Sequence, residues 1–368
     1  MKIVADDKIP FLRGTLDDVA EVVYKRGADI CRADVADADV LIVRTRTKCN
    51  EALLHDTKVS GIFTATIGYD HIDTTYCDAH NIYWQNAPGC NAASVEQYVA
   101  SALAVLRLRH DVPLRGRVIA VVGLGHVGSR VATLARRLGM KVLMVDPPRA
   151  EAEKSDDYIS FDTALRLADI VSFHVPLTCD GPYPTFHLLN ENTLSRLKRG
   201  SIVINTSRGP VCQTEALKKG LTDGTIRHAI VDVWENEPNI DKDLMWQTAI
   251  STPHIAGYST DSKRRGTQMV IDAINEHYGL GLKYTLSTLP TPAEHSIILP
   301  QNIDAEEAAC RMFLHIYDIE SDSRWLRTLP MNFEEQRGNY HLRREIGAFS
   351  VAKEYKHYKY LKSFGLSD

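Results

Sequence analysis

Hydrophobic residues along this chain gather mainly in short continuous runs, and helix-like segments separate the runs. Runs of four or five apolar residues are typical of strands buried on both faces of a parallel sheet. The alternation of such runs with helical segments predicts an α/β fold built on doubly wound parallel sheets. The predicted strands are Met1–Ala5, Val40–Val43, Phe63–Ile67, Val118–Val122, Lys141–Val145, Ile170–Val175, Ser201–Asn205, Ala229–Val233 and Ala249–Thr252.

Helices are predicted where apolar residues recur at helical spacing between these strands. The longest covers Ala93–Arg109, with Asn91 placed to cap its first turn. Another long helix, Asp261–His277, follows the last predicted strand. Shorter helical segments are predicted at Thr15–Lys25, Ala164–Ala168, Leu194–Leu197 and Thr214–Leu221.

The clearest local motif lies between residues 118 and 146, where a predicted strand runs into a G-x-G-x-x-G sequence. Gly123 suits a tight strand-to-helix turn, Gly125 lets the backbone approach a pyrophosphate, and Gly128 allows close packing of helix and strand. The helix that follows presents N–H groups and its positive dipole end to phosphates. Asp146 ends the next strand, where a carboxylate accepts hydrogen bonds from an adenosine ribose and repels a 2′-phosphate. The motif therefore predicts a dinucleotide site that prefers NAD to NADP.

This order of segments indicates an inserted domain. Residues 1–95 already form one α/β unit before the glycine motif begins, and the later long helix returns the chain to that unit. We therefore predict a substrate-binding domain from residues 1–95 and 256–280, and an NAD-binding domain from residues 96–255. A proline-containing linker precedes an aromatic-rich tail, which we predict to be a small α+β domain. Its aromatic content favours a dimer interface.

Three polar residues follow predicted strand ends in the second half of the chain. Arg208 can hold a carboxylate bidentately, and His254 can take a hydroxyl proton as a hydride leaves the adjacent carbon. Glu237, if hydrogen-bonded to the imidazole, favours its protonated form and fixes its tautomer. Taken alone, a loop arginine is usually a solvated cation, a Glu before Pro is usually a turn residue, and a single His is most often a surface or core residue. Together, at one edge of a parallel sheet, they indicate hydride transfer from a 2-hydroxy acid.

Composition narrows the class of protein. The 368 residues are 44% hydrophobic and 24% charged, as in globular proteins, and the net charge of −4 gives no reason to expect nucleic acid or an anionic membrane as a partner. The seven cysteines are scattered without metal-ligand or disulfide-framework spacing, so no metal site is expected. No apolar run reaches membrane-spanning length, and acidic residues appear too early for a secretory signal. We therefore expect a cytoplasmic protein.

Five stretches together resemble the D-2-hydroxyacid dehydrogenase family: VVGLGHVGSRVA, DIVSFHVPLT, LKRGSIVINTSRGPV, VDVWENEP and TPHIAGY. The resemblance implies a Rossmann-type NAD domain inserted in a flavodoxin-like α/β substrate domain. It also implies that Arg208 binds the substrate carboxylate, and that Glu237 supports His254 as the acid/base group. The dinucleotide contacts it implies, beside the three motif glycines, are His126, Val127, Asp146, Val175, Thr206, Ser207, Arg208, Asp232 and Gly257.

The two ends of the chain resemble one branch of that family, whose members oxidise a phosphorylated 2-hydroxy acid. The tail stretches YDIESDSRWLR and NYHLRREI are similar to its C-terminal dimerisation domain, which implies a homodimer formed through residues 281–368. In that branch, positions matching Thr45, Thr66 and Tyr258 contact substrate. Arg44 and Arg46 are candidates for the substrate phosphate, and Arg343 or Arg344 for reaching it from a partner subunit.

Two other functions stay open at this point. One is a related dehydrogenase acting on 3-phosphoglycerate or glycerate. The other is a non-enzymatic corepressor that senses NAD(H), because some proteins with this fold have that function. The tail favours the branch with the C-terminal dimerisation domain over both alternatives.

Overall fold

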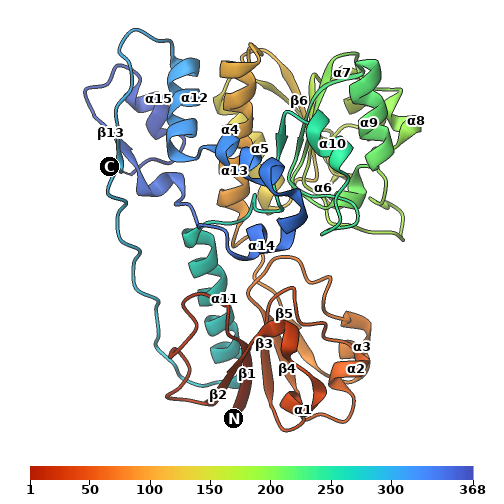
Figure 1. Cartoon of the computed structure of the whole chain (residues 1–368), viewed down its shortest axis with the longest axis vertical. Helices are drawn as coiled ribbons and strands as arrows, with labels where there is room; N and C mark the ends of the chain where they lie inside the picture. Colours follow the sequence, from red (N-terminus) through yellow and green to blue (C-terminus); the bar gives the residue numbers. More distant parts are fainter. Residues whose placement is uncertain (368) are drawn as a thin grey trace. The chain divides into compact units, whose positions relative to one another are not determined.

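The computed structural model describes residues 1–367, which form two compact units (Figure 1). Unit 1 consists of residues 1–91 and 259–290, and the described part of unit 2 consists of residues 92–258 and 291–367. The first unit is thus built from two separate stretches of chain. Three domains were expected, whereas the C-terminal tail groups here with the inserted unit.

Unit 1 is organised on a five-stranded parallel sheet in the order β2-β1-β3-β4-β5. Counted along the chain, this 2-1-3-4-5 order is that of flavodoxin-like sheets. Its strands are β1 (Lys2–Asp6), β2 (Glu21–Lys25), β3 (Val40–Val43), β4 (Gly61–Thr64) and β5 (Tyr83–Gln85). Its helices are α1 (Arg32–Val35), α2 (Glu51–Leu54), α3 (Thr74–Ala79) and α11 (Thr260–Tyr278), with a 3₁₀ turn at Gly27–Asp29.

The central strands of this sheet are buried on both faces, as their apolar runs predict. Leu41 and Ile62 pack on the side of the three short helices, whereas Ile42 and Phe63 pack with residues of α11. Successive strand residues point to opposite faces, so an uninterrupted apolar run covers both layers.

The prediction of a helix over Thr15–Lys25 is wrong. Residues Glu21–Lys25 instead form β2, the edge strand that pairs with β1. The segment contains β-branched and aromatic residues in the order EVVYK, which favours a strand when a neighbouring strand offers hydrogen-bonding groups. Helical spacing of the apolar residues was therefore a misleading signal over so short a segment.

Unit 2 contains a six-stranded parallel sheet in the order β11-β10-β9-β8-β6-β7. A single parallel bridge joins Tyr158 to Met144 of β7, where the Rossmann order 3-2-1-4-5-6 has its outer strand. The strands are β6 (Val118–Val122), β7 (Lys141–Val145), β8 (Ile170–Phe173), β9 (Ser201–Asn205), β10 (Ile226–Val231) and β11 (Ile250–Ser251).

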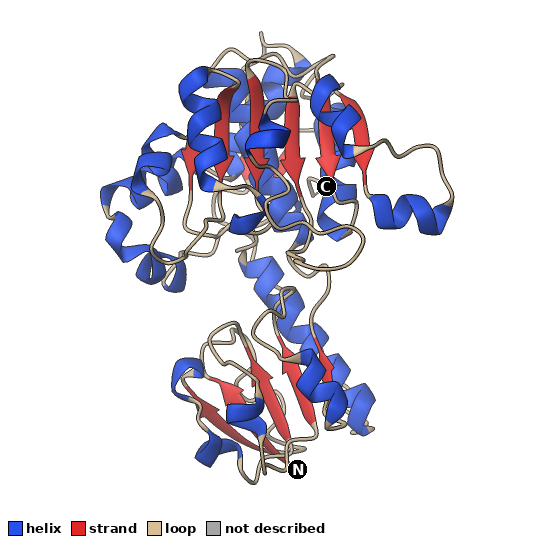
Figure 2. Cartoon of the chain, turned by 90° about the vertical axis from the view of Figure 1, so that its right-hand side faces the viewer, coloured by secondary structure: helices blue, strands red, loops and turns tan. Residues whose placement is uncertain are grey.

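Helices cover both faces of this sheet (Figure 2). One face carries α4 (Ala92–Arg109) and α5 (His126–Arg137). The other carries α7 (Phe161–Leu167), α8 (Glu191–Leu194), α9 (Thr214–Asp223) and α10 (Lys242–Gln247), and α6 (Pro147–Glu153) follows β7. The predicted doubly wound α/β class is thereby confirmed. One local expectation fails, because Oδ1 of Asn91 is buried without a hydrogen bond and does not cap α4.

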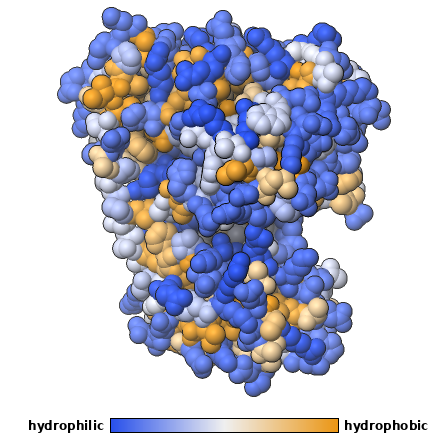
Figure 3. Space-filling view, viewed as in Figure 1, coloured by the Kyte–Doolittle hydropathy of each residue, from blue (hydrophilic) through white to orange (hydrophobic). Residues whose placement is uncertain are grey.

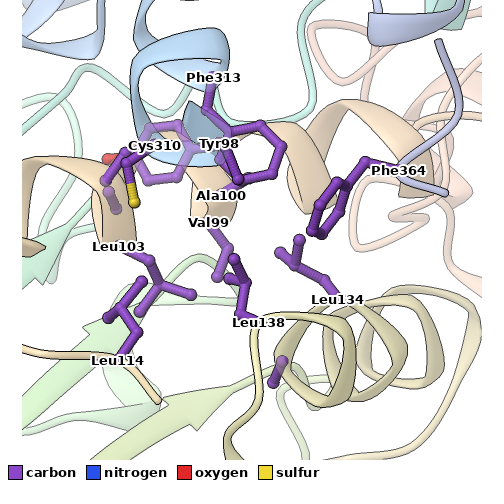
Figure 4. Close-up of a cluster of buried hydrophobic side chains, with 14 of the residues drawn as sticks. Tyr98, Val99, Ala100, Leu103, Leu114, Leu134, Leu138, Cys310, Phe313 and Phe364 are labelled. Carbon is purple, nitrogen blue, oxygen red and sulfur yellow. The ribbon is translucent and has the colours of Figure 1, made fainter. Parts of the chain in front are cut away.

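The C-terminal tail packs against α4. Its elements are β12 (Ser296–Ile297), α12 (Ala305–Ile316), α13 (Ile319–Thr328), α14 (Phe333–Gly338), β13 (Ser350–Val351) and α15 (Tyr358–Lys362). Figure 4 shows Leu103 of α4 in a cluster that holds Leu134 of α5 together with Phe313 and Phe364 of the tail. α4 is therefore apolar on nearly all sides because it is buried between α5 and the tail.

Hydrophilic side chains predominate on the face of the molecule drawn in Figure 3, with smaller groups of hydrophobic side chains between them. Within residues 1–367, no helix has both the length and the apolar character needed to span a bilayer. All seven cysteines are free, and no cluster of metal-binding side chains occurs in the described part of the chain.

Candidate active site

The glycine motif forms a tight turn at the carboxyl end of β6. Gly123 has a φ of +89°, a conformation that L side chains rarely adopt, and α5 begins at His126 without a side-chain cap. A Cβ on Gly128 would overlap the carbonyl oxygen of Gly123, so only glycine permits this close packing. A Cβ on Gly125, in contrast, would meet nothing within 4 Å. The open space beside Gly125 and the uncapped helix start fit a dinucleotide pyrophosphate.

Asp146 connects this turn to the next helix. Its Oδ2 accepts a hydrogen bond from the backbone N–H of Leu124 at 2.7 Å, and its Oδ1 caps α6 by accepting from the N–H of Arg149 at 3.1 Å. A carboxylate can accept about four hydrogen bonds, so both oxygens retain capacity for ribose hydroxyls. The residue thus stands where the motif predicts the ribose contact.

The other predicted cofactor contacts follow the ends of neighbouring strands. Val175 comes after β8, and its side chain lies close to the Gly123 turn. Thr206 comes after β9, and its Oγ1 lies 3.3 Å from Nδ1 of His174. Ser207 is buried, and its hydroxyl donates to Oδ1 of Asn205 at 2.9 Å. These strand ends border the point where strand order reverses, which is where open α/β sheets bind ligands.

Asp232 is only 1% exposed, and its carboxylate organises the loop that carries His254. Its oxygens accept hydrogen bonds from the hydroxyl of Thr252 and from the backbone N–H groups of Ile255 and Ala256, at 2.7–2.9 Å. Burial raises the pKa of Asp232, and the charge of His254 together with these hydrogen bonds opposes the rise. Asp232 therefore positions the loop, and its contact with a cofactor stays a prediction.

Glu237 and His254 form the central pair of the site. Nδ1 of His254 lies 2.8 Å from Oε2 of Glu237, and the backbone N–H of Trp234 donates to Oε1 at 2.9 Å. Burial opposes ionisation of Glu237, but the His254 charge, these hydrogen bonds and Arg337 hold the pKa of Glu237 below its ordinary value. The pair commits Nδ1 to the carboxylate and leaves Nε2 for a substrate proton.

Arg208 lies on the loop after β9, with its Nη1 donating to the carbonyl of Ser207 at 2.8 Å. The next residue, Gly209, is packed so closely against the backbone of Trp234 that a Cβ would overlap it. This contact ties the Arg208 loop to the segment that leads into Glu237. Sequence reasoning placed both residues at strand ends, and the structure joins their two loops.

The predicted substrate residues of unit 1 follow adjacent strands. Arg44 and Thr45 follow β3, and Thr66 follows β4, with Val43 and Thr64 paired in register. Arg44 forms an ion pair with buried Asp6, with Nε 3.0 Å from Oδ2. Oγ1 of Thr66 lies 2.7 Å from the hydroxyl of Thr64 and donates to the carbonyl of Gly68. Arg46 and Thr45 are exposed.

The tail contributes arginines to unit 2 in a way that sequence reasoning missed. Arg343 is 8% exposed, and its guanidinium donates to the carbonyls of Ile255 and Ala256 at 3.2 and 2.6 Å. The prediction that Arg343 reaches a partner's substrate is therefore wrong, because its own chain buries and binds it. Arg337 approaches Glu237 and was not predicted at all. Nothing in the local sequence of either arginine distinguishes it from a surface cation.

Comparison with protein families and curated proteins agrees with this architecture. The model of the D-isomer specific 2-hydroxyacid dehydrogenase NAD binding domain matches residues 96–256, and that of a domain of unknown function (DUF3410) matches residues 288–365. The erythronate-4-phosphate dehydrogenase of Bacteroides fragilis is 45% identical over 352 residues, which cover 95% of this chain and 99% of the relative. The enzyme of Escherichia coli O157:H7 is 39% identical over 356 residues, covering 95% and 94%.

This chain belongs to the erythronate-4-phosphate dehydrogenase family. The family assignment confirms two expectations, namely that the protein is a 2-hydroxyacid dehydrogenase and that its cofactor is NAD. Members of the erythronate-4-phosphate dehydrogenase family at this level of identity match the chain along nearly its full length, tail included.

Solved structures of related enzymes share the fold. The D-lactate dehydrogenase of Aquifex aeolicus, complexed with NAD and lactic acid, has a TM-score of 0.65 and 26% identity over 76% of this chain and 96% of its own. The NAD⁺-bound 3-phosphoglycerate dehydrogenase of Entamoeba histolytica has a TM-score of 0.64 at 23% identity, covering 79% and 98%. The second likeness supports the fold alone.

The two glycines of the turn give a matched test of the cofactor cradle. We expect Gly128→Ala to lower the free energy of unfolding by about 1–3 kcal/mol, because its Cβ overlaps the Gly123 carbonyl. We expect Gly125→Ala to keep the wild-type Tm but to weaken NADH binding about tenfold, because its methyl group stands where a pyrophosphate approaches. Thermal unfolding and NADH fluorescence titration measure both effects. Unchanged NADH affinity in Gly125→Ala would contradict the placement of the pyrophosphate.

Proposed function

We propose that this protein oxidises 4-phospho-D-erythronate at C2 to (R)-3-hydroxy-2-oxo-4-phosphooxybutanoate with NAD, in the biosynthesis of pyridoxal 5′-phosphate (vitamin B6). The observation that carries the proposal is the similarity to erythronate-4-phosphate dehydrogenases over 95% of the chain. The Glu237–His254 pair supports it, because such a pair suits proton transfer from a hydroxyl group.

The proposed reaction divides between the cofactor and the residues of unit 2. NAD, when bound, supplies the hydride acceptor at its nicotinamide ring. Arg208 binds the substrate carboxylate through two charge-assisted hydrogen bonds and so fixes the orientation of C2. His254 accepts the proton of the C2 hydroxyl at Nε2, and the C–O bond becomes a carbonyl as the hydride leaves C2. Glu237 stabilises the imidazolium that results.

Binding of the substrate phosphate is assigned to the unit 1 residues. We propose that Arg46 and Arg44 supply the positive charge, and that Thr45 and Thr66 contact the substrate. Asp6 pairs with Arg44 and neutralises part of its charge. Tyr258 is a further proposed substrate contact.

One assay separates this proposal from its alternatives. Purified protein is mixed with NAD and either erythronate 4-phosphate, 3-phosphoglycerate or glycerate, and NADH formation is followed by absorbance. We expect a higher kcat/KM with erythronate 4-phosphate than with the other two. An equal or higher value with 3-phosphoglycerate or glycerate would overturn the substrate and leave the reaction class in place. Absence of turnover with all three would favour an NAD(H)-sensing corepressor.

We further propose a cytoplasmic homodimer that forms through the C-terminal tail. Free cysteines suit a reducing compartment. The tail exposes three large apolar side chains, Ile298 at 91%, Met331 at 74% and Leu329 at 49%. A subunit interface would remove such side chains from water, which is favourable for apolar surface.

A charge substitution tests the interface. We expect Met331→Asp to shift the protein from dimer to monomer in sedimentation velocity, because a carboxylate is costly to bury in an apolar interface. Trp246→Asp is the control, since Trp246 is a large apolar residue, 62% exposed, that lies outside the tail. A monomeric wild-type protein, or a dimer unaffected by Met331→Asp, would count against the proposed interface.

A further inference from the structure

Arg337 brings a buried positive charge from the tail to the catalytic pair. Its Nη1 lies 4.0 Å from Oε2 of Glu237, the oxygen that faces Nδ1 of His254 at 2.8 Å. Only 16% of the Arg337 side chain is exposed, compared with 19% for Glu237 and 26% for His254. At such burial, charges interact more strongly than exposed ones and salt screens them less.

α14 holds Arg337 at this place. Phe333, at the start of the helix, is fully buried in the core of unit 2. Gln336 is buried next to Arg337, and its Nε2 donates to the carbonyls of Trp325 and Leu329 at 3.2 and 3.0 Å. The approach of Arg337 to Glu237 is therefore set by helix packing and is not a chance position of a surface side chain.

The surroundings keep Arg337 charged. Burial alone would lower the pKa of Arg337, but Tyr258, Glu237 and Glu334 raise it above its usual value. Its Nε is buried and has no hydrogen-bond partner among the described residues. The titratable and charged groups around the pair are Asp232 on the strand-end loop, Tyr258 before α11, and Glu334 and Arg337 on α14.

We propose that Arg337 is a positioning residue that holds Glu237 in line with His254 and limits how strongly the Glu237 charge retains a proton on the imidazole. For oxidation, His254 must be unprotonated when the substrate binds. A neighbouring carboxylate favours the protonated ring, and a cation beside that carboxylate reduces the bias. The tail thus adjusts the pH range in which the base works. The inference rests on the proposed role of His254 as the proton acceptor.

Arg337→Gln tests this inference through the pH dependence of kcat/KM for oxidation. Without the cation, Glu237 holds the proton on His254 more strongly, so we expect the acidic limb to move to higher pH by about one unit. At a given pH on that limb, kcat/KM then falls about tenfold, and it recovers at alkaline pH. Arg337→Lys retains the positive charge and keeps the wild-type position of the limb.

Two further variants keep the test decisive. Arg324 belongs to the same tail, is 65% exposed and pairs with Asp318. We expect Arg324→Gln to leave the pH profile of kcat/KM unchanged. Glu334→Gln removes a carboxylate 3.8 Å from Arg337 and moves the acidic limb to lower pH, which tests the inference even where Arg337→Gln fails to fold.

Three results would overturn the inference. They are a uniform loss of kcat/KM at every pH in Arg337→Gln, a rise in KM with an unmoved profile, and an unmoved profile in Glu334→Gln. The first would indicate a purely structural role for Arg337, and the second direct binding of the substrate anion. Should 3-phosphoglycerate prove to be the better substrate, the same profiles are measured with it, so failure of the proposed substrate and failure of this inference are distinguishable.

Discussion

Replacing His254 by alanine is expected to lower kcat/KM for oxidation of erythronate 4-phosphate by about 10²- to 10⁴-fold, the usual contribution of a positioned general base. The imidazole is the group that the Glu237 hydrogen bond orients, and alanine leaves no acceptor for the hydroxyl proton. Steady-state assays of NADH formation measure the loss. NADH affinity, followed by fluorescence, is expected to stay close to that of the wild type.

A second histidine serves as the control for this substitution. His55 lies on the surface of unit 1, where its Nδ1 faces Asp56 at 3.0 Å and 52% of its side chain is exposed. His55→Asn is expected to keep wild-type kinetics. If His254→Ala turned over at the wild-type rate, the assignment of the proton acceptor would be wrong.

Replacing Arg208 by methionine is expected to lower kcat/KM by about 10²- to 10⁴-fold, because two hydrogen bonds to a charged group are lost at about 1.5–3 kcal/mol each. Most of the effect is expected in KM, since the carboxylate is bound in both the ground state and the transition state. Initial rates over a range of substrate concentrations separate KM from kcat.

The matched control is an exposed arginine of the same unit. Arg166 pairs with Asp162 on α7, and 61% of its side chain is exposed. Arg166→Met is expected to leave both constants unchanged. Retention of wild-type KM in Arg208→Met would show that another cation binds the carboxylate, and Arg337 would then be the first to examine.

Local sequence patterns predicted those features that need a particular residue type or hydrophobic periodicity at one place in the chain. The turn at Gly123 needs a positive φ, and the packing of Gly128 needs the absence of a Cβ, so the motif is visible in the residues themselves. Strands β3, β6 and β9 are continuous apolar runs because both of their faces are buried, and the predicted spans match those observed.

The predictions from sequence failed where contact with another segment of the chain determines the local structure. Residues Glu21–Lys25 became a strand because β1 offers a partner edge, which helical spacing in the sequence does not reveal. Asn91 has the side chain of a helix cap but does not make the bond, because the hydrogen-bonding geometry at that position depends on the surrounding packing. The pairing of Glu237 with His254 was expected from a family resemblance, and the structure provides its distance and burial.

The sequence by itself determined the α/β class, the dinucleotide motif and the three candidate catalytic residues, because each follows from local periodicity or from a required residue type. Only the tertiary structure placed Arg343 on the carbonyls of the His254 loop and Arg337 beside Glu237. Both contacts depend on how the tail packs against α4 and the core of unit 2. That packing is driven by non-directional burial of apolar surface, which leaves no signature in the few residues around either arginine.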